Sequence, residues 1–146
     1  MKKLTIYLDF DGTVVEHMYP KIGRCNFGCM EVIKKLQDAG HHIILNTMRV
    51  EFRDGSLEEA IEYLQGSWRF FKDRNSGDEL REISQWTLEK IHPHPFDIDT
   101  AIERGELYID DIATGIPLKS AAMTGGNMVD WDQLDSIFWE KGIYNL

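Results

Sequence analysis

The stretch Asp9-Phe10-Asp11-Gly12-Thr13-Val14 follows directly on the run Leu4-Thr5-Ile6-Tyr7-Leu8, and together these residues decide the fold. The first run is short and rich in β-favouring side chains, and it ends abruptly in two acids and a glycine. This pattern predicts a buried strand that leads into a polar loop at its carboxyl end.

A helix and a second strand are predicted next along the chain. Residues 27–39 have helical spacing, with apolar side chains at Cys29, Val32, Ile33 and Leu36. Gly40 then stands where a helix often ends. Residues 42–46 (His-Ile-Ile-Leu-Asn) are apolar on consecutive positions, which is typical of a strand in a parallel sheet covered on both faces. Strand, helix and strand in this order form a βαβ unit with a right-handed crossover.

The rest of the chain continues the alternation of helices and strands. A capping box, Ser56-Leu57-Glu58-Glu59, predicts a helix that runs to about Gln65. Further elements are predicted as a strand at 68–71, a helix at 78–90, a strand at 107–109 and a helix at 130–141. No repeat, low-complexity tract or linker divides the 146 residues. We therefore expect one α/β domain, residues 1–146, with a mainly parallel sheet.

Polar clusters follow three of the predicted strands. They lie at residues 9–13, at residues 46–49 and at the pair Asp110-Asp111. Open α/β sheets bind ligands at the carboxyl ends of their strands. If the strands are parallel and adjacent, the three clusters meet at one edge of the sheet, and the sequence predicts a site there.

The charge and hydropathy of the chain indicate which classes of partner such a site could bind. The chain has 25 acidic side chains against 16 Lys plus Arg, so it lacks the basic surface of a general nucleic-acid binder. A phosphate-containing substrate stays compatible, because a bound divalent ion can invert the local field. No stretch reaches the length needed to cross a bilayer, and the first residues lack the apolar run of a signal peptide. We therefore expect a cytoplasmic protein with no membrane partner.

Three segments together resemble the motifs of the haloacid dehalogenase superfamily. Asp9-Phe10-Asp11-Gly12-Thr13 resembles its first motif, Asp-x-Asp-Gly-Thr, and the strand that ends at Thr47 resembles its second. Tyr108-Ile109-Asp110-Asp111 resembles its fourth, a strand that ends in paired acids. The resemblance implies a three-layer, Rossmann-like α/β sandwich with a mainly parallel sheet. Taken together, the motifs resemble those of a group of small bacterial and phage members, and the short intervals between them leave no room for a full cap domain.

The resemblance also implies an activity, the hydrolysis of a phosphate monoester with Mg²⁺ as cofactor. Asp9 would attack phosphorus, and Asp11 would protonate the leaving oxygen and then accept a proton from water. The metal ligands would be Asp9, the backbone carbonyl of Asp11 and Asp110, with Asp111 close by or acting through water. Thr47 would donate its hydroxyl to a phosphoryl oxygen. Arg49 would bind the phosphate of the substrate or a second anion, unless it is an exposed structural arginine.

The cation of the third motif is less clearly marked. Lys90, in Lys90-Ile91-His92-Pro93-His94-Pro95-Phe96, partly resembles the lysine that would pair with the nucleophile. Ile91 replaces the usual proline, so the match is partial, and Arg104 is the alternative cation.

A chain without a cap domain would leave its site open. The phosphorylated substrate could then be large, or a neighbouring subunit in an oligomer could supply the lid. Met18 to Phe27 could serve as a short flap over the site.

Two other functions compete with phosphohydrolysis. The chain could be a phosphate-binding or metal-binding regulatory module that has kept the fold and lost turnover. A response-regulator-like receiver also gathers acids at strand ends. However, a receiver places its paired acids early in the chain, and the late Asp110-Asp111 pair fits this order poorly.

Overall fold

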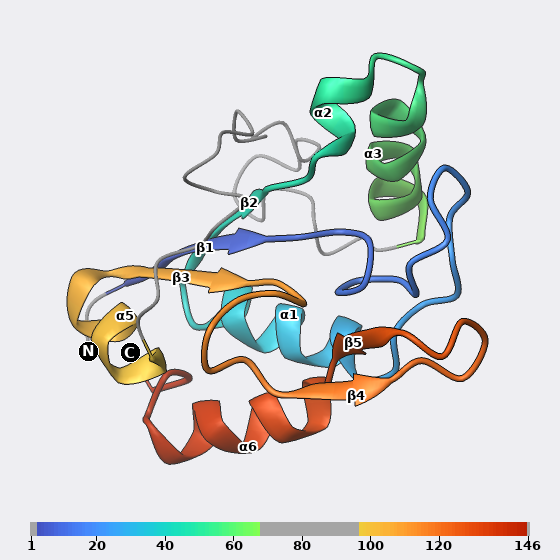
Figure 1. Ribbon diagram of the computed structural model, residues 1–146. Helices are drawn as coiled ribbons and strands as arrows, with labels where there is room; N and C mark the ends of the chain where they lie inside the picture. Colours follow the sequence, from blue (N-terminus) through green and yellow to red (C-terminus); the bar gives the residue numbers. More distant parts are fainter. Residues whose placement is uncertain (1–2, 68–96, 146) are drawn as a thin grey trace.

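The computed structural model describes residues 3–67 and 97–145 of the chain. These residues form an α/β fold, as expected, with a small parallel sheet, a separate hairpin and several helices (Figure 1). In chain order the elements are β1 (Thr5–Leu8), α1 (Cys29–Asp38), β2 (His42–Leu45), α2 (Arg49–Phe52), α3 (Ser56–Ser67), α5 (Ile98–Arg104), β3 (Glu106–Ile109), β4 (Leu118–Ser120), β5 (Asn127–Val129) and α6 (Trp131–Glu140).

The central sheet has the strand order β2-β1-β3, and both pairings are parallel. Leu8 at the end of β1 is in register with Leu45 of β2 and with Ile109 of β3. The three strands therefore end level with one another. This register places the residues that follow them, Asp9 and Asp110 among them, at one edge of the sheet.

One face of the sheet carries the hydrophobic core. Alternate strand residues face it and are buried, among them Ile6, Leu8, Ile43, Leu45, Leu107 and Ile109. Figure 1 shows α1 below the sheet and α6 below α1. Both helices turn apolar stripes into this core, namely Val32, Ile33 and Leu36 from α1 and Trp131, Leu134 and Phe138 from α6. Burial of these side chains is the main favourable term that holds the layers together.

The opposite face of the sheet is less buried than the sequence pattern predicted. Tyr7, Ile44 and Tyr108 point to this face and are half-buried, and the rings of Tyr7 and Tyr108 lie 4.8 Å apart. The strand predicted at 68–71 and the helix predicted at 78–90 lie outside the described residues. No helix in the described part of the chain has the length and apolar character needed to cross a membrane.

The structure adds elements that the sequence pattern did not reveal. Helix α5 begins after Asp97, whose carboxylate accepts a hydrogen bond from the Thr100 amide (2.9 Å), and it ends at Gly105. Strands β4 and β5 form an antiparallel hairpin that leads into α6. The capping prediction for α3 was only partly right, because Asp54 accepts the hydrogen bond from the Ser56 amide at the start of this helix (3.0 Å).

Candidate functional site

Three carboxylates meet at the carboxyl edge of the sheet. Asp9 follows β1, and Asp110 and Asp111 follow β3, which pairs with β1. One carboxylate oxygen from each residue lies within 4.8 Å of the other two. Asp110 is buried, and Asp9 and Asp111 are half-buried. We call these three residues the acidic cluster. Its position confirms that the two strand ends meet, as the sequence indicated.

The acidic cluster is electrostatically crowded. Burial raises the pKa of Asp9 well above its ordinary value, and the charges of Asp110 and Asp111 raise it further. Burial also raises the pKa of Asp110 to about 7, helped by a hydrogen bond and by repulsion from Asp111. Among residues 3–67 and 97–145, no Lys or Arg forms an ion pair with these three carboxylates. Such a group of oxygens favours either protons or a bound cation.

Gly12 and Thr13, in the loop after β1, help to shape the cluster. The Thr13 hydroxyl donates a hydrogen bond to Oδ2 of Asp9 (3.1 Å). Gly12 has φ +82°, and a Cβ atom at this position would lie 2.5 Å from Oδ2 of Asp111. Glycine is therefore needed twice over, for the backbone conformation and for the close approach of Asp111. Both residues belong to the Asp-x-Asp-Gly-Thr motif, but the motif alone indicates neither contact.

The same loop is fixed to the C-terminal part of the chain. The Thr13 carbonyl accepts hydrogen bonds from the Trp131 indole (2.8 Å) and from the Asn26 side-chain amide (2.9 Å). Asn26 also donates to the Val129 carbonyl (2.7 Å), and all these partners are buried. A loop held by several buried hydrogen bonds keeps Asp9 in one orientation.

Asp11 lies in a different environment from the acidic cluster. Its two carboxylate oxygens accept hydrogen bonds from Nε (2.8 Å) and Nη2 (2.7 Å) of Arg49 in a bidentate ion pair. The side chain of Arg49 is fully buried, and that of Asp11 is 9% exposed. Both oxygens of Asp11 are thus paired with Arg49. Asp9, two residues earlier in the chain, instead lies next to the carboxylates of Asp110 and Asp111.

Arg49 uses all five of its N–H groups inside the protein. Besides the two bonds to Asp11, Nη1 donates to the carbonyls of Pro20 (3.3 Å) and Ser56 (3.1 Å), and Nη2 donates to that of Lys21 (3.0 Å). An arginine has five such donors, so this arrangement leaves none for a substrate's phosphate. The alternative of an exposed structural arginine was wrong about exposure, because Arg49 is buried.

The remaining predicted site residues are placed as follows. Thr47 is buried just beyond β2, at the same sheet edge, and its hydroxyl accepts a hydrogen bond from the Arg49 amide (3.2 Å). Lys90 lies outside the described residues. Arg104 is exposed in the last turn of α5, before β3 begins, whereas Asp110 follows the end of β3. The strand separates these positions by about 10 Å or more, so the structure does not bring Arg104 to the cluster.

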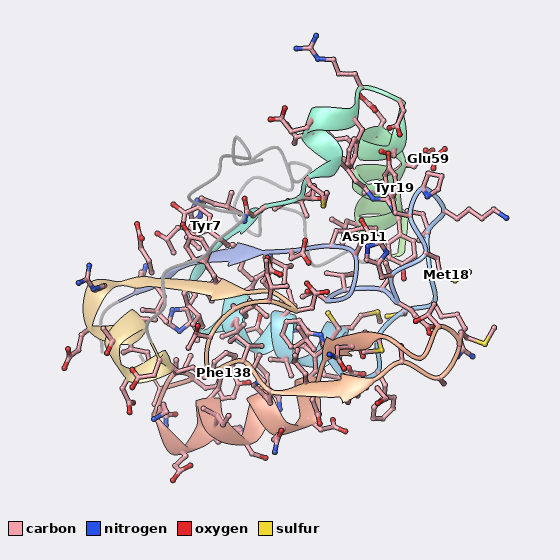
Figure 2. The ribbon with its side chains drawn as sticks, viewed as in Figure 1. Tyr7, Asp11, Met18, Tyr19, Glu59 and Phe138 are labelled. Atoms are coloured by element: carbon pink, nitrogen blue, oxygen red, sulfur yellow. The ribbon has the colours of Figure 1, made fainter. Side chains whose placement is uncertain are left out.

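The segment predicted as a flap, Met18 to Phe27, lies beside α2 and α3. Figure 2 shows Tyr19 and Asp11 on the same side of the molecule as α3. The Tyr19 hydroxyl bonds to the Asp54 carboxylate, and its ring lies 4.9 Å from that of Phe52. We call residues 18–27 the flap, and it contacts Arg49 through its backbone carbonyls.

Comparison with known proteins supports the α/β fold and does not indicate an activity. No protein-family model matches the chain, and no curated protein matches it. A solved structure, described as that of a conserved protein from Bacteroides thetaiotaomicron, is 27% identical in sequence, with a TM-score of 0.55. The match covers 96% of this chain and 93% of the other. The chain is thus similar over nearly its whole length to a protein whose description names no function, and the likeness supports an α/β fold for the chain.

Proposed function

We propose that the protein is a Mg²⁺-dependent phosphohydrolase of the haloacid dehalogenase type, with Asp9 as its nucleophile. The observation that carries the proposal is the acidic cluster, which gathers three carboxylates from two parallel strand ends within 4.8 Å. The motif Asp9-Phe10-Asp11-Gly12-Thr13 supplies one of them and the loop around it. The proposal includes the finer fold expected for that superfamily, a three-layer Rossmann-like sandwich.

The residues of the cluster suit a hard divalent cation. Asp9, Asp110 and Asp111 offer carboxylate oxygens, which Mg²⁺ prefers, and the Asp11 carbonyl is a further candidate ligand. Burial and mutual repulsion raise the pKa values of Asp9 and Asp110, so the ionised cluster favours a compensating positive charge. A bound Mg²⁺ would supply that charge and reduce the repulsion between an anionic nucleophile and an anionic phosphate.

Asp9 carries out the covalent step in this proposal. One of its carboxylate oxygens attacks phosphorus, and the bond from phosphorus to the leaving oxygen breaks. For this step Asp11 must carry a proton on an oxygen released from Arg49, and it gives this proton to the leaving oxygen, so that a neutral alcohol leaves. Asp11 then accepts a proton from water as the water attacks the aspartyl phosphate, which releases inorganic phosphate and restores Asp9. The hydrogen bond from Thr13 holds the Asp9 carboxylate in one direction throughout.

Two further residues have proposed roles at the phosphoryl group. Thr47, buried at the end of β2, is proposed to donate its hydroxyl to a phosphoryl oxygen. Lys90 is proposed as the cation that pairs with the nucleophile, as its partial resemblance to the third motif implies.

Hydrolysis of an aryl phosphate, with and without Mg²⁺, tests this function. We expect turnover that requires Mg²⁺ and falls by about 10³-fold or more in Asp9→Asn, because an amide cannot replace the carboxylate nucleophile. Acid quenching followed by peptide mass spectrometry should place the trapped phosphoryl group on Asp9. A phosphoryl group on another residue would contradict the mechanism, and so would full activity in Asp9→Asn.

The Asp11–Arg49 pair favours a second candidate function. Arg49 donates hydrogen bonds to both oxygens of Asp11, so neither oxygen is free to exchange a proton with a substrate or water. A metal-binding and phosphate-binding module without turnover would have this arrangement permanently. Mg²⁺ binding without hydrolysis across a broad panel of phosphoesters would favour this function over the first.

A further inference from the structure

We propose that Arg49 is a positioning residue, which fixes the direction of the Asp11 carboxylate and links it to the flap. This inference rests on the proposed function, because it concerns the residue that would deliver the proton to the leaving group. It assigns Arg49 a role different from the phosphate-binding role that its place after Thr47 suggested.

The hydrogen bonds of Arg49 join four separate segments of the chain. Its guanidinium contacts Asp11 in the loop after β1, Pro20 and Lys21 in the flap, and Ser56 at the start of α3. Arg49 itself stands at the start of α2, just beyond the end of β2. A planar fork with five fixed donors can satisfy such a set in only one orientation, so the position of each partner constrains the others.

Aromatic rings further restrict the guanidinium. Its central carbon lies 5.1 Å from the centre of the Phe10 ring and 5.2 Å from that of Tyr19. Phe10 belongs to the loop of the nucleophile, and Tyr19 belongs to the flap. Contacts of this kind favour a cation over the ring face. Each of the two segments that Arg49 connects therefore contributes an aromatic ring next to the guanidinium.

The flap cannot move away without disturbing Asp11. Displacing it would break the bonds from Arg49 to the Pro20 and Lys21 carbonyls and would remove the Tyr19 ring from the guanidinium. Buried N–H groups without partners are costly, so Arg49 would reorient and take the Asp11 carboxylate with it. Movements of the flap are in this way transmitted to the proposed proton donor through one side chain.

Substrates with different leaving groups separate positioning from phosphate binding. 4-Nitrophenyl phosphate has a leaving group that needs little help from an acid, whereas an alkyl phosphate needs a proton. We expect Asp11→Asn and Arg49→Met to lower kcat for the alkyl phosphate about tenfold or more beyond their effect on the nitrophenyl ester. The double variant should be no worse than either single one, because both act through the same group.

The same measurements contain the results that would overturn the proposal. If Arg49 binds the phosphate, Arg49→Met will raise KM equally for both esters, and its effect will multiply with that of Asp11→Asn. If Arg49 only supports the fold, kcat will fall equally for both leaving groups. Arg49→Lys keeps the charge and loses the fork, so it should show the same selectivity with a smaller loss, and it serves if Arg49→Met does not fold. Arg53→Met, at a nearby exposed arginine, is the matched control and should change neither ratio.

Hydrogen exchange tests the link to the flap without any turnover. We expect Arg49→Met and Asp11→Asn to increase amide exchange across residues 18–24 in the metal-free, full-length protein, and Arg53→Met to leave it unchanged. Unchanged exchange in Arg49→Met would overturn the link. Failure of the wild-type protein to hydrolyse any phosphoester would overturn the proposed function, and the exchange result would still decide whether Arg49 couples Asp11 to the flap.

Discussion

The acidic cluster and the Asp11–Arg49 pair are neighbouring regions built from the same kind of residue, and they differ in how charge is balanced. Asp9 shares its sheet edge with Asp110 and Asp111, and its pKa is raised by burial and by their charges. Asp11, two residues later, has both oxygens bound by a buried arginine. Within the described residues, no Lys or Arg pairs with the acidic cluster, whereas Asp11 is fully paired. This difference indicates where a cation would bind and where the protein has already supplied one.

The largest loss of stability is expected from breaking the Asp11–Arg49 pair. Arg49→Met would leave the Asp11 carboxylate buried without its partner, and we expect the free energy of unfolding to fall by about 3–5 kcal/mol. Lys34→Met, which breaks the exposed Lys34–Asp38 pair (51% and 39% exposed side chains), should cost less than about 0.5 kcal/mol. Urea denaturation of both variants measures the two losses. Equal losses would show that Arg49 is not the buried anchor described above.

The pH dependence of the free energy of unfolding tests the charge balance of the acidic cluster. Folding raises the pKa of Asp110 from 3.8 to about 7, so the folded protein binds more protons than the unfolded chain between these values. The free energy of unfolding of the metal-free protein should therefore be highest near pH 4 and fall as the pH rises through about 7, and Asp9 contributes in the same direction. We expect a loss of about 2–4 kcal/mol, measured by denaturant titration in a metal chelator. A rise in stability over this range would contradict the crowding of the cluster.

The same substitution should have opposite effects in the two regions. Asp9→Asn removes one charge from the crowded cluster, and we expect it to stabilise the metal-free protein at pH 8 by about 1 kcal/mol. Asp11→Asn removes the partner of a buried arginine and should destabilise it by about 2–3 kcal/mol. Thermal denaturation at a fixed pH compares the two variants directly. Effects of the same sign would remove the distinction between the regions.

A smaller effect tests how closely the loop after β1 packs on the cluster. Gly12→Ala combines a positive φ with a Cβ atom 2.5 Å from Oδ2 of Asp111, whereas Gly55→Ala has φ +86° and open space around the new atom. We expect Gly55→Ala to cost about 1 kcal/mol and Gly12→Ala about 1–2 kcal/mol more. The difference between their free energies of unfolding isolates the contact with Asp111. A difference near zero would mean that Asp111 moves aside freely.

The sequence predicted the sheet and its edge well, because both depend on local patterns. The runs at 4–8, 42–46 and 107–109 are short, apolar and followed by polar residues, and each became a parallel strand that ends at the same edge. Helices α1 and α6 followed from their apolar stripes. The hairpin β4–β5 was missed because Leu118 and Ser120 are both exposed and give no clear alternation.

The role of Arg49 depends on contacts that no local pattern reveals. Its partners Pro20, Lys21 and Ser56 are distant in sequence or contribute only backbone carbonyls, which every residue has. The hydrogen bond from Thr13 to Asp9 was weakly indicated by the sequence, because residues four apart in a tight loop can face each other. The prediction of Lys90 as the third-motif cation stays a prediction, because that residue lies outside the described part of the chain.

A calorimetric Mg²⁺ titration at pH 8 tests most directly that the acidic cluster is a cation site. The wild-type protein should bind one Mg²⁺, Asp110→Asn should lose this binding, and Asp11→Asn, whose side chain faces Arg49, should keep it. Gly55→Ala serves as a control that leaves the edge intact. Absence of Mg²⁺ binding to the wild-type protein, or binding that survives Asp110→Asn and is lost in Asp11→Asn, would contradict the account.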